Sequence, residues 1–168
     1  AGGSGLDTCE GTVPDGQAGP YSGTDASEHI SGTSTAEDIL GMGGDDCVYG
    51  NGGSDDLYGD GSAPVAFNGD DAVFGGDDSD GLYGDAFDGY VQSGGADRLY
   101  GGGGDDVLFG EAFSGSVSVG GVDEIHGGTG NDAIYGETTE FVTTGGGDFL
   151  FGDAGNDDIY GDSSLIVL

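Results

Sequence analysis

Basic residues are almost absent from this sequence. Among 168 residues, Arg98 is the single lysine or arginine, against 33 aspartates and glutamates, and the formal net charge is −32. A chain with this charge repels a phosphate backbone, so nucleic acid is excluded as a partner. No side chain here can neutralise the acid, and the 42 glycines add a large entropic cost to folding. We therefore expect folding to require bound cations.

Long apolar runs and cysteines are also scarce. The longest aliphatic run, "LIVL" at Leu165 to Leu168, is far too short to cross a membrane, so no membrane insertion is expected. Two cysteines are too few for a zinc site. We expect Cys9 and Cys47 to form a disulfide, with two separate buried thiols as the alternative. The first residue is Ala1 rather than Met, which fits a processed secreted protein and equally a trimmed chain.

What is abundant is a regular repeat, which argues against the disorder that this glycine and charge content would otherwise predict. Its marker is an aliphatic residue that lies two places before a glycine and two places after an acidic residue. From Val48 onward, steps of 9 residues between markers alternate with steps of 16 or 17, so the full unit has 25 or 26 residues. The markers are Ile30, Ile39, Val48, Leu57, Val73, Leu82, Leu99, Leu108, Ile125, Ile134, Leu150 and Ile159.

This unit predicts an all-β fold, a parallel β-solenoid. Nine residues are too few for a helical hairpin, but they suffice for a tight glycine turn and a three-residue strand, and two such units make one coil. The markers of successive coils would then stack as the inner core. With one inward side chain per strand that core is small, and by itself it cannot offset the conformational entropy lost on folding.

The same spacing aligns acidic residues in two columns, one at each turn of the coil. Coils lie about 4.8 Å apart, so the carboxylates of one column would repel each other strongly. A divalent cation between neighbouring turns removes this repulsion, and calcium suits the turns better than magnesium because it accepts about six to eight oxygens in a loose geometry. The expected ligands are Asp46, Asp71, Asp97, Asp123 and Asp148 in the first column and Asp55, Asp80, Asp106, Asp132 and Asp157 in the second column.

Two segments, "GGTGNDAIY" from Gly127 and "GGGGDDVLF" from Gly101, fit the pattern G-G-x-G-x-D-x-U-x at every position, where U is aliphatic. Further copies depart from it at one or two glycines; they begin at Gly41, Gly50, Gly75 and Gly152. This pattern resembles the RTX family, the haemolysin-type calcium-binding repeat, over roughly residues 32–162. The resemblance implies a right-handed parallel β-roll with calcium in both turns, bound by the two Asp columns, and a secreted protein that folds on meeting extracellular calcium.

Two features depart from the family pattern. At the start, Glu28 and Glu37 replace the aspartate and the preceding glycines are absent, which weakens the expectation of calcium there. The long step carries inserts, and "SVSV" at Ser116 to Val119 predicts an extra short strand in one of them, so we expect the inserts to stack as a side arm. Each insert starts with Gly and an acid, and these acids form a third column of Asp60, Asp85, Glu111, Glu137 and Asp162. The third column is either another row of calcium ligands or a solvated acidic edge.

Aromatic rings follow most of the markers and, by strand alternation, face outward, where they would stack as two ribbons. They are Tyr49, Tyr58, Phe74, Tyr83, Tyr100, Phe109, Tyr135, Phe151 and Tyr160. We expect the inserts to cover one ribbon, which leaves the other open to a partner molecule. His126 occupies one of these aromatic positions, and Arg98 is expected to form a local ion pair with a neighbouring turn.

Two segments are expected: an irregular N-terminal cap or subunit-contact segment at residues 1–27, and the calcium-binding solenoid at residues 28–168. The last insert, "GDSSLIVL" from Gly161, is followed by no polar cap, and an open solenoid end pairs readily with another chain. We therefore expect a secreted structural protein whose copies join head to tail into calcium-stabilised extracellular filaments. The alternative is a calcium-dependent accessory or secretion domain of a larger secreted enzyme, toxin or adhesin.

No catalytic site is expected. His29 and His126 lie far apart in the repeat, and no nucleophile–base motif occurs. Acidic pairs such as Asp105 and Asp106 resemble the carboxylate pairs of glycosidases, but every repeat has them, so a structural role explains them better. An ice-binding role is disfavoured because the threonine pairs lie in the single insert at 136–147 and form no regular ladder.

Overall fold

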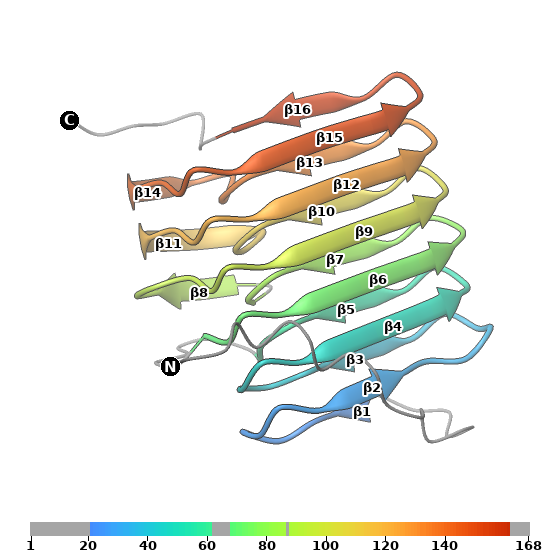
Figure 1. Cartoon of the computed structure of the whole chain (residues 1–168), viewed down its shortest axis with the longest axis horizontal. Coiled ribbons are helices and arrows are strands. Elements are labelled where there is room, and N and C mark those ends of the chain that lie inside the picture. The colour runs from blue at the N-terminus through green and yellow to red at the C-terminus, as the bar shows by residue number, and fades with distance from the viewer. Residues whose placement is uncertain (1–20, 62–67, 87, 162–168) are drawn as a thin grey trace, which may run out of the picture.

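The structure, a computed structural model, describes residues 21–61, 68–86 and 88–161, and within these ranges it contains strands and no helix. All strand pairs are parallel, in three sheets. The seven-stranded sheet contains, in order, β1 (Tyr21–Ser22), β3 (Asp38–Leu40), β5 (Asp56–Tyr58), β7 (Gly81–Tyr83), β10 (Val107–Phe109), β13 (Ala133–Tyr135) and β16 (Asp158–Tyr160). The six-stranded sheet contains β2 (His29–Ser31), β4 (Cys47–Gly52), β6 (Ala72–Asp77), β9 (Arg98–Gly103), β12 (Glu124–Thr129) and β15 (Phe149–Ala154). Figure 1 shows these two sheets as the faces of one winding roll, so the predicted β-solenoid is confirmed.

The core consists of two facing stacks of the predicted marker residues, one from each sheet. Leu82, Leu108 and Ile134 lie in register on β7, β10 and β13 and are fully buried. Val73, Leu99 and Ile125 make the matching stack on β6, β9 and β12. Because strand alternation places one inward side chain in each three-residue strand, the core is one residue wide, as expected.

The turns with the family motif share one backbone shape. In each, the residues four and two positions before the aspartate have positive φ: Met42 and Gly44, Asn51 and Gly53, Gly76 and Asp78, Gly102 and Gly104, Gly128 and Gly130, and Asp153 and Gly155. Glycine adopts positive φ without strain, whereas Met42, Asn51, Asp78 and Asp153 adopt it at some cost. The four imperfect copies of the motif therefore keep the turn of the perfect copies.

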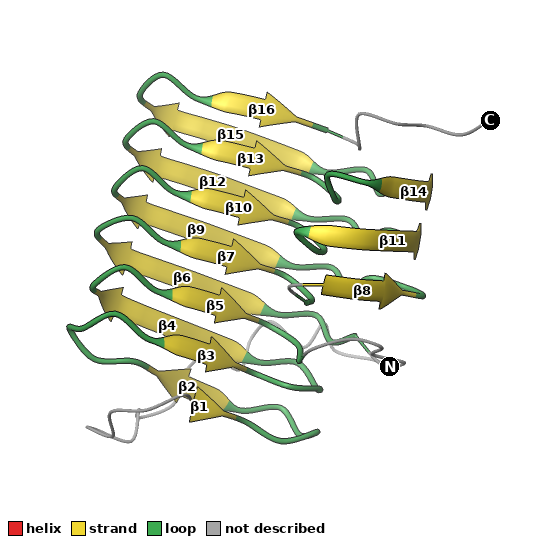
Figure 2. Cartoon of the chain, turned by 180° about the vertical axis from the view of Figure 1, so that it is seen from behind, coloured by secondary structure: helices red, strands yellow, loops and turns green. Residues whose placement is uncertain are grey.

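The inserts form a separate side sheet of β8 (Asp88–Val91), β11 (Ser114–Val119) and β14 (Phe141–Thr144). Figure 2 shows this sheet standing beside the ends of the seven-stranded sheet, with its strands stacked along the same axis. Its small core consists of Val91, Ala112 and Val117, with Val142 packed against them. The predicted strand at Ser116 to Val119 and the predicted side arm are both present.

The two aromatic ribbons are also present, and they differ in exposure. On the seven-stranded sheet, Tyr83 and Phe109 stack with ring centroids 5.6 Å apart and are 6% and 1% exposed, and Phe113 of an insert packs edge-on against Phe109. On the six-stranded sheet, the rings are half-buried or exposed, and His126 takes an aromatic place between Tyr100 and Phe151. In the described part of the chain, an insert therefore covers the ribbon of the seven-stranded sheet at Phe109, while Tyr160 at the end of this ribbon is 47% exposed.

The amino-terminal part of the described chain adds three findings. β1 lies within the segment expected to form a cap, and it pairs with β3, so the sheet includes residues before 28. Cys47 is buried in β4, while Cys9 lies outside the described residues, so their disulfide stays a prediction. In the described part, no helix is long and apolar enough to span a membrane.

Candidate metal centres in the turns

The aspartates of the first and second columns are linked along the roll by their own backbone. In the first column, Asp71 N–H donates to Asp97 Oδ1 at 2.8 Å, and Asp97 N–H donates to Asp123 Oδ1 at 2.9 Å. The second column repeats the pattern: Asp80 N–H donates to Asp106 Oδ1 at 2.8 Å, and Asp106 N–H donates to Asp132 Oδ1 at 2.9 Å. One oxygen of each carboxylate is thus used by the protein, and this bond points the side chain into the turn.

The second oxygen of these carboxylates is buried, and no hydrogen bond reaches it. This holds for Oδ2 of Asp46, Asp55, Asp71, Asp80, Asp97, Asp106, Asp123 and Asp132. Burying an ionised carboxylate with an unpaired oxygen costs several kcal/mol. These turns therefore require either protons or cations at a series of matched positions.

A glycine carbonyl lies beside the unpaired oxygen in seven of these eight aspartates, all but Asp132. A Cβ built on Gly110 would lie 2.2 Å from Asp123 Oδ2 and 2.1 Å from Gly136 O of the next coil. A Cβ built on Gly101 would lie 2.4 Å from both Asp106 Oδ2 and Gly127 O. In these turns, the glycine two places after the marker therefore keeps open a small space that is lined by a carboxylate oxygen and a carbonyl oxygen.

The donors in these spaces are all hard oxygens, which calcium accepts in an irregular arrangement. Among the described residues, no three His, Cys, Asp or Glu side chains are placed to hold a metal ion by themselves. An ion in a turn must therefore take backbone carbonyls as well as aspartate, as the sequence predicted. The residues present fit calcium.

The electrostatics of the second column follow from burial. Burial raises the pKa of Asp55 to about 6, and hydrogen bonding from Glu37 N–H only partly offsets it. Burial likewise raises the pKa of Asp80 to about 7 and that of Asp106 to about 6, and the charge of the next aspartate in the column adds to both shifts. Without a cation, these groups therefore ionise only at about pH 6 to 7 instead of near pH 4.

The pKa values of the first-column aspartates Asp71 and Asp123 are raised further than those of the second column. Burial raises the pKa of Asp71 to about 9, and the nearby charge of Asp60 adds to the shift. Burial also raises the pKa of Asp123 to about 9, here with Glu111 as the next cause. Asp60 and Glu111 belong to the third column, so the third column lies against the first.

The third column is buried rather than solvated. Asp60, Asp85, Glu111 and Glu137 are fully buried, so the interpretation of this column as a solvated acidic edge is wrong for these four residues. Asp162 lies outside the described residues. The sequence showed the alignment of the column but not its burial, because burial depends on how the side sheet folds back.

The last described coil holds its aspartates less tightly. Asp148 Oδ1 accepts from Asp123 N–H, and Asp157 Oδ1 accepts from Asp132 N–H, both at 3.1 Å. Both side chains are half-buried, whereas their counterparts on inner coils are buried. Their columns continue to this coil, but it lacks the cover that the inner coils receive.

The turns at Glu28 and Glu37 are closed by the protein itself. Thr24 N–H donates to Glu28 Oε2 and Thr33 N–H donates to Glu37 Oε2, each at 2.7 Å. The Thr33 hydroxyl also donates to Glu37 Oε1, and the Thr35 hydroxyl donates to the same oxygen at 3.1 Å. The sequence shows the missing aspartates, but the role of the threonines as hydrogen-bond donors to these glutamates appears only in the structure. The signal in the sequence was a Thr four places before each Glu.

A further ladder explains the acidic pairs. Asp105 Oδ1 accepts from Asn131 N–H at 2.7 Å, and Asp70 Oδ1 accepts from Ala96 N–H at 3.0 Å. These residues directly precede column aspartates and are exposed. The pairs therefore connect neighbouring coils, which agrees with the structural role predicted for them.

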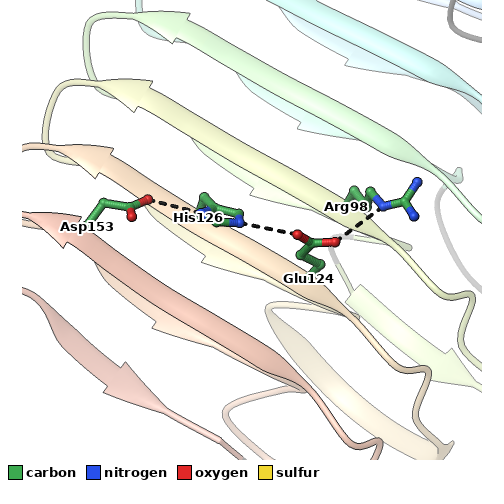
Figure 3. Close-up of polar contacts among 4 residues, drawn as sticks. All are labelled: Arg98, Glu124, His126 and Asp153. Carbon is green, nitrogen blue, oxygen red and sulfur yellow. Dashed lines mark hydrogen bonds and ion pairs between the residues drawn. The ribbon is translucent and has the colours of Figure 1, made fainter.

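The single arginine lies in a short ionic chain across three strands. Arg98 Nε lies 3.4 Å from Glu124 Oε2. His126 lies 3.5 Å from Glu124 Oε1 and 3.1 Å from Asp153 Oδ2. Figure 3 shows these four side chains in a row. The predicted local ion pair of Arg98 exists, although its partner is on the adjacent strand β12 and not in a turn. His126 is held by these contacts and by its ring stacking, and these contacts place no serine or cysteine nucleophile beside it.

Comparison with protein families found one match. The model of the RTX calcium-binding nonapeptide repeat matches four segments of the chain, residues 31–63, 93–117, 118–138 and 141–164. Comparison with curated proteins and with solved structures found no significant match. The matched segments together span more than half of the chain and include both kinds of turn described above.

Proposed function

Because the chain belongs to the family of proteins with RTX calcium-binding nonapeptide repeats, we propose that it is a secreted structural protein whose copies stack head to tail into calcium-stabilised extracellular filaments. RTX repeats bind calcium and typically occur in secreted proteins.

Calcium would be held in the turns by the unpaired Oδ2 atoms of the first and second columns, together with carbonyl oxygens of the glycines that lie two places after the markers. When bound, it supplies positive charge where the chain has none. The aspartates orient their second oxygens inward through the Oδ1 hydrogen bonds between coils. Each ion would thereby connect neighbouring coils, so the ions and the thin core stabilise the same stacking.

The observation that supports assembly is the open face of the last described coil. Ile159 on β16 is 46% exposed, whereas its register partner Ile134 on β13 is fully buried. Phe149 on β15 is 59% exposed, and within the described chain β15 and β16 each pair with one strand only. At the opposite end, β1 and β2 are likewise edge strands of the described sheets. Since all strands are parallel, joining these two ends continues both sheets without closing, which generates a fibre.

Electron microscopy and light scattering of the purified protein with calcium test this proposal. We expect fibres from the wild type, and we expect Ile159→Arg to abolish them while its circular dichroism stays that of the wild type. Val122→Arg is the control, because Val122 is 54% exposed and is not at the open face. A monodisperse wild-type monomer would instead favour an accessory domain of a larger protein, and fibres from Ile159→Arg would exclude the head-to-tail contact.

A further inference from the structure

The third column brings carboxyl groups into direct contact where the side sheet leaves the roll. Asp85 and Glu111 are fully buried, and their carboxyl groups lie within hydrogen-bonding range of each other. Asp60 makes the same contact with Asp85 on the other side. Ionised carboxylates only accept hydrogen bonds, so these groups cannot satisfy one another without a proton or a cation between them.

One oxygen of each third-column carboxylate is already held by the protein. Gly69 N–H donates to Asp60 Oδ2 at 3.2 Å, Asn68 Nδ2 donates to Asp85 Oδ2 at 2.8 Å, and Gly121 N–H donates to Glu111 Oε1. The other oxygens, Asp60 Oδ1, Asp85 Oδ1 and Glu111 Oε2, are buried without a hydrogen-bond partner. This is the arrangement found in the first and second columns: one anchored oxygen and one that is available.

The first column supplies more unpaired oxygens beside them. The charges of Asp85 and Glu111 act on Asp97, and the charge of Glu111 acts on Asp123. Oδ2 of Asp97 and Oδ2 of Asp123 are unpaired, as is the buried amide oxygen of Asn68. Arg98 is paired with Glu124, so the one basic side chain of the protein is already in use elsewhere.

We propose that the third column and the first column together form a row of calcium sites with more carboxylate ligands than the turns of the second column have. At each level, an ion would take carboxylate oxygens from the insert and from the turn, together with carbonyl oxygens of the glycines. The second column lies at the opposite edge of the roll, where no insert supplies an acid. A calcium ion there would have carboxylate ligands from this column only. Because calcium affinity rises with the number of charged ligands, the first-column edge binds calcium more tightly and fills first.

This row would also attach the side sheet to the roll. Asp85 and Glu111 lie shortly before β8 and β11, and Asp97 and Asp123 lie between those strands and the six-stranded sheet. An ion that joins the two columns therefore closes the base of each insert. The third-column acid belongs to the inserts of this chain and lies outside the nonapeptide copies.

Glu111→Gln tests the proposal, because glutamine keeps the shape of a neutral glutamic acid and can still accept from Gly121 N–H. We expect two classes of sites in calcium titration calorimetry of the wild type, and in Glu111→Gln a loss of about tenfold or more in affinity at the tighter class. Glu140→Gln, a change at an exposed glutamate of the next insert, is the matched control and should leave both classes unchanged.

The competing explanation is that the third column is neutral and shares protons. In that case Glu111→Gln binds calcium as the wild type does, and this result would overturn the proposal. If Glu111→Gln does not fold, Asp85→Asn is measured in the same way, and hydrogen exchange reports whether amides of β8 and β11 lose protection before those of β10. The inference rests on the calcium binding of the proposed function but not on assembly. A wild type that binds no calcium contradicts both, whereas an unchanged tight class in the variants contradicts this inference alone.

Discussion

The turns at Glu37 and Asp55 lie on neighbouring coils, yet their carboxylates differ in the hydrogen bonds that they accept. Glu37 Oε2 accepts from Thr33 N–H at 2.7 Å, whereas Asp55 Oδ2 has no hydrogen-bond partner. In the Asp55 turn, Asn51 takes the position that Thr33 takes in the Glu37 turn. Asn51 has a φ of +76°, whereas Thr33 does not have a positive φ. A glycine carbonyl faces the carboxylate in both turns. One turn is therefore closed by protein donors, and the other is left open for a cation.

Acidic side chains alone therefore do not define a calcium turn in this protein. Burial raises the pKa of Glu37, but hydrogen bonds from Thr33 and Thr35 outweigh it, so that this pKa is lowered. Burial raises the pKa of Asp55 to about 6, and the hydrogen bond from Glu37 N–H offsets this shift only in part. The direction of the shift separates a carboxylate that the fold has satisfied from one that awaits a positive charge.

The largest expected effect is that of calcium removal. At pH 8, a strong chelator should unfold the roll, because the buried Oδ2 atoms of many aspartates lose their positive partner at once. In the same chelator at pH 5, β-structure should return, because protons can replace the cation. Circular dichroism at both pH values measures this, and a spectrum unchanged by the chelator at pH 8 would contradict the model of cation-dependent stacking.

The sign of this pH effect follows from the pKa shifts. Burial raises the pKa of Asp71 and of Asp123 from 3.8 to about 9, so the metal-free fold binds protons that the unfolded chain releases. Their contribution to stability is fully present below 3.8 and is lost as the pH rises through about 9. Glu37 acts in the opposite direction, because a lowered pKa gives stability that is lost on acidification. The aspartates outnumber it, so acid stabilises the metal-free roll.

The next effect in size is that of a methyl group at the open turns. Gly110→Ala should destabilise the protein by more than about 2 kcal/mol, because its Cβ would lie 2.1 Å from Gly136 O and 2.2 Å from Asp123 Oδ2. Gly147→Ala, where a Cβ meets nothing within 4 Å, should change stability by less than about 0.5 kcal/mol. Thermal unfolding with saturating calcium compares the two. Equal stabilities would show that the space beside Asp123 tolerates a side chain.

Much of this architecture could be predicted from the sequence, because a solenoid turns spacing directly into stacking. The markers from Ile39 to Ile134 form the core, and the insert with "SVSV" forms a strand of the side sheet. The burial of the third column could not be predicted, since it depends on how the side sheet folds back on the roll. The hydrogen bond from Thr33 N–H to Glu37 Oε2 could not be predicted from the sequence either, because it depends on the direction of one N–H group.

The smallest expected effect is that of removing one charge from the Asp55 turn or from the Glu37 turn. Asp55→Asn and Glu37→Gln each remove one charge at neighbouring levels of the roll while keeping the shape of the side chain. Asp55→Asn should lower calcium affinity at its turn by about tenfold or more, because its unpaired oxygen is a proposed ligand. Glu37→Gln should leave the calcium isotherm unchanged and cost about 1 kcal/mol or less, because the hydrogen bonds from Thr33 become neutral ones. If titration calorimetry finds the same loss in both variants, the Glu37 turn binds calcium too, and its threonine contacts do not replace the ion.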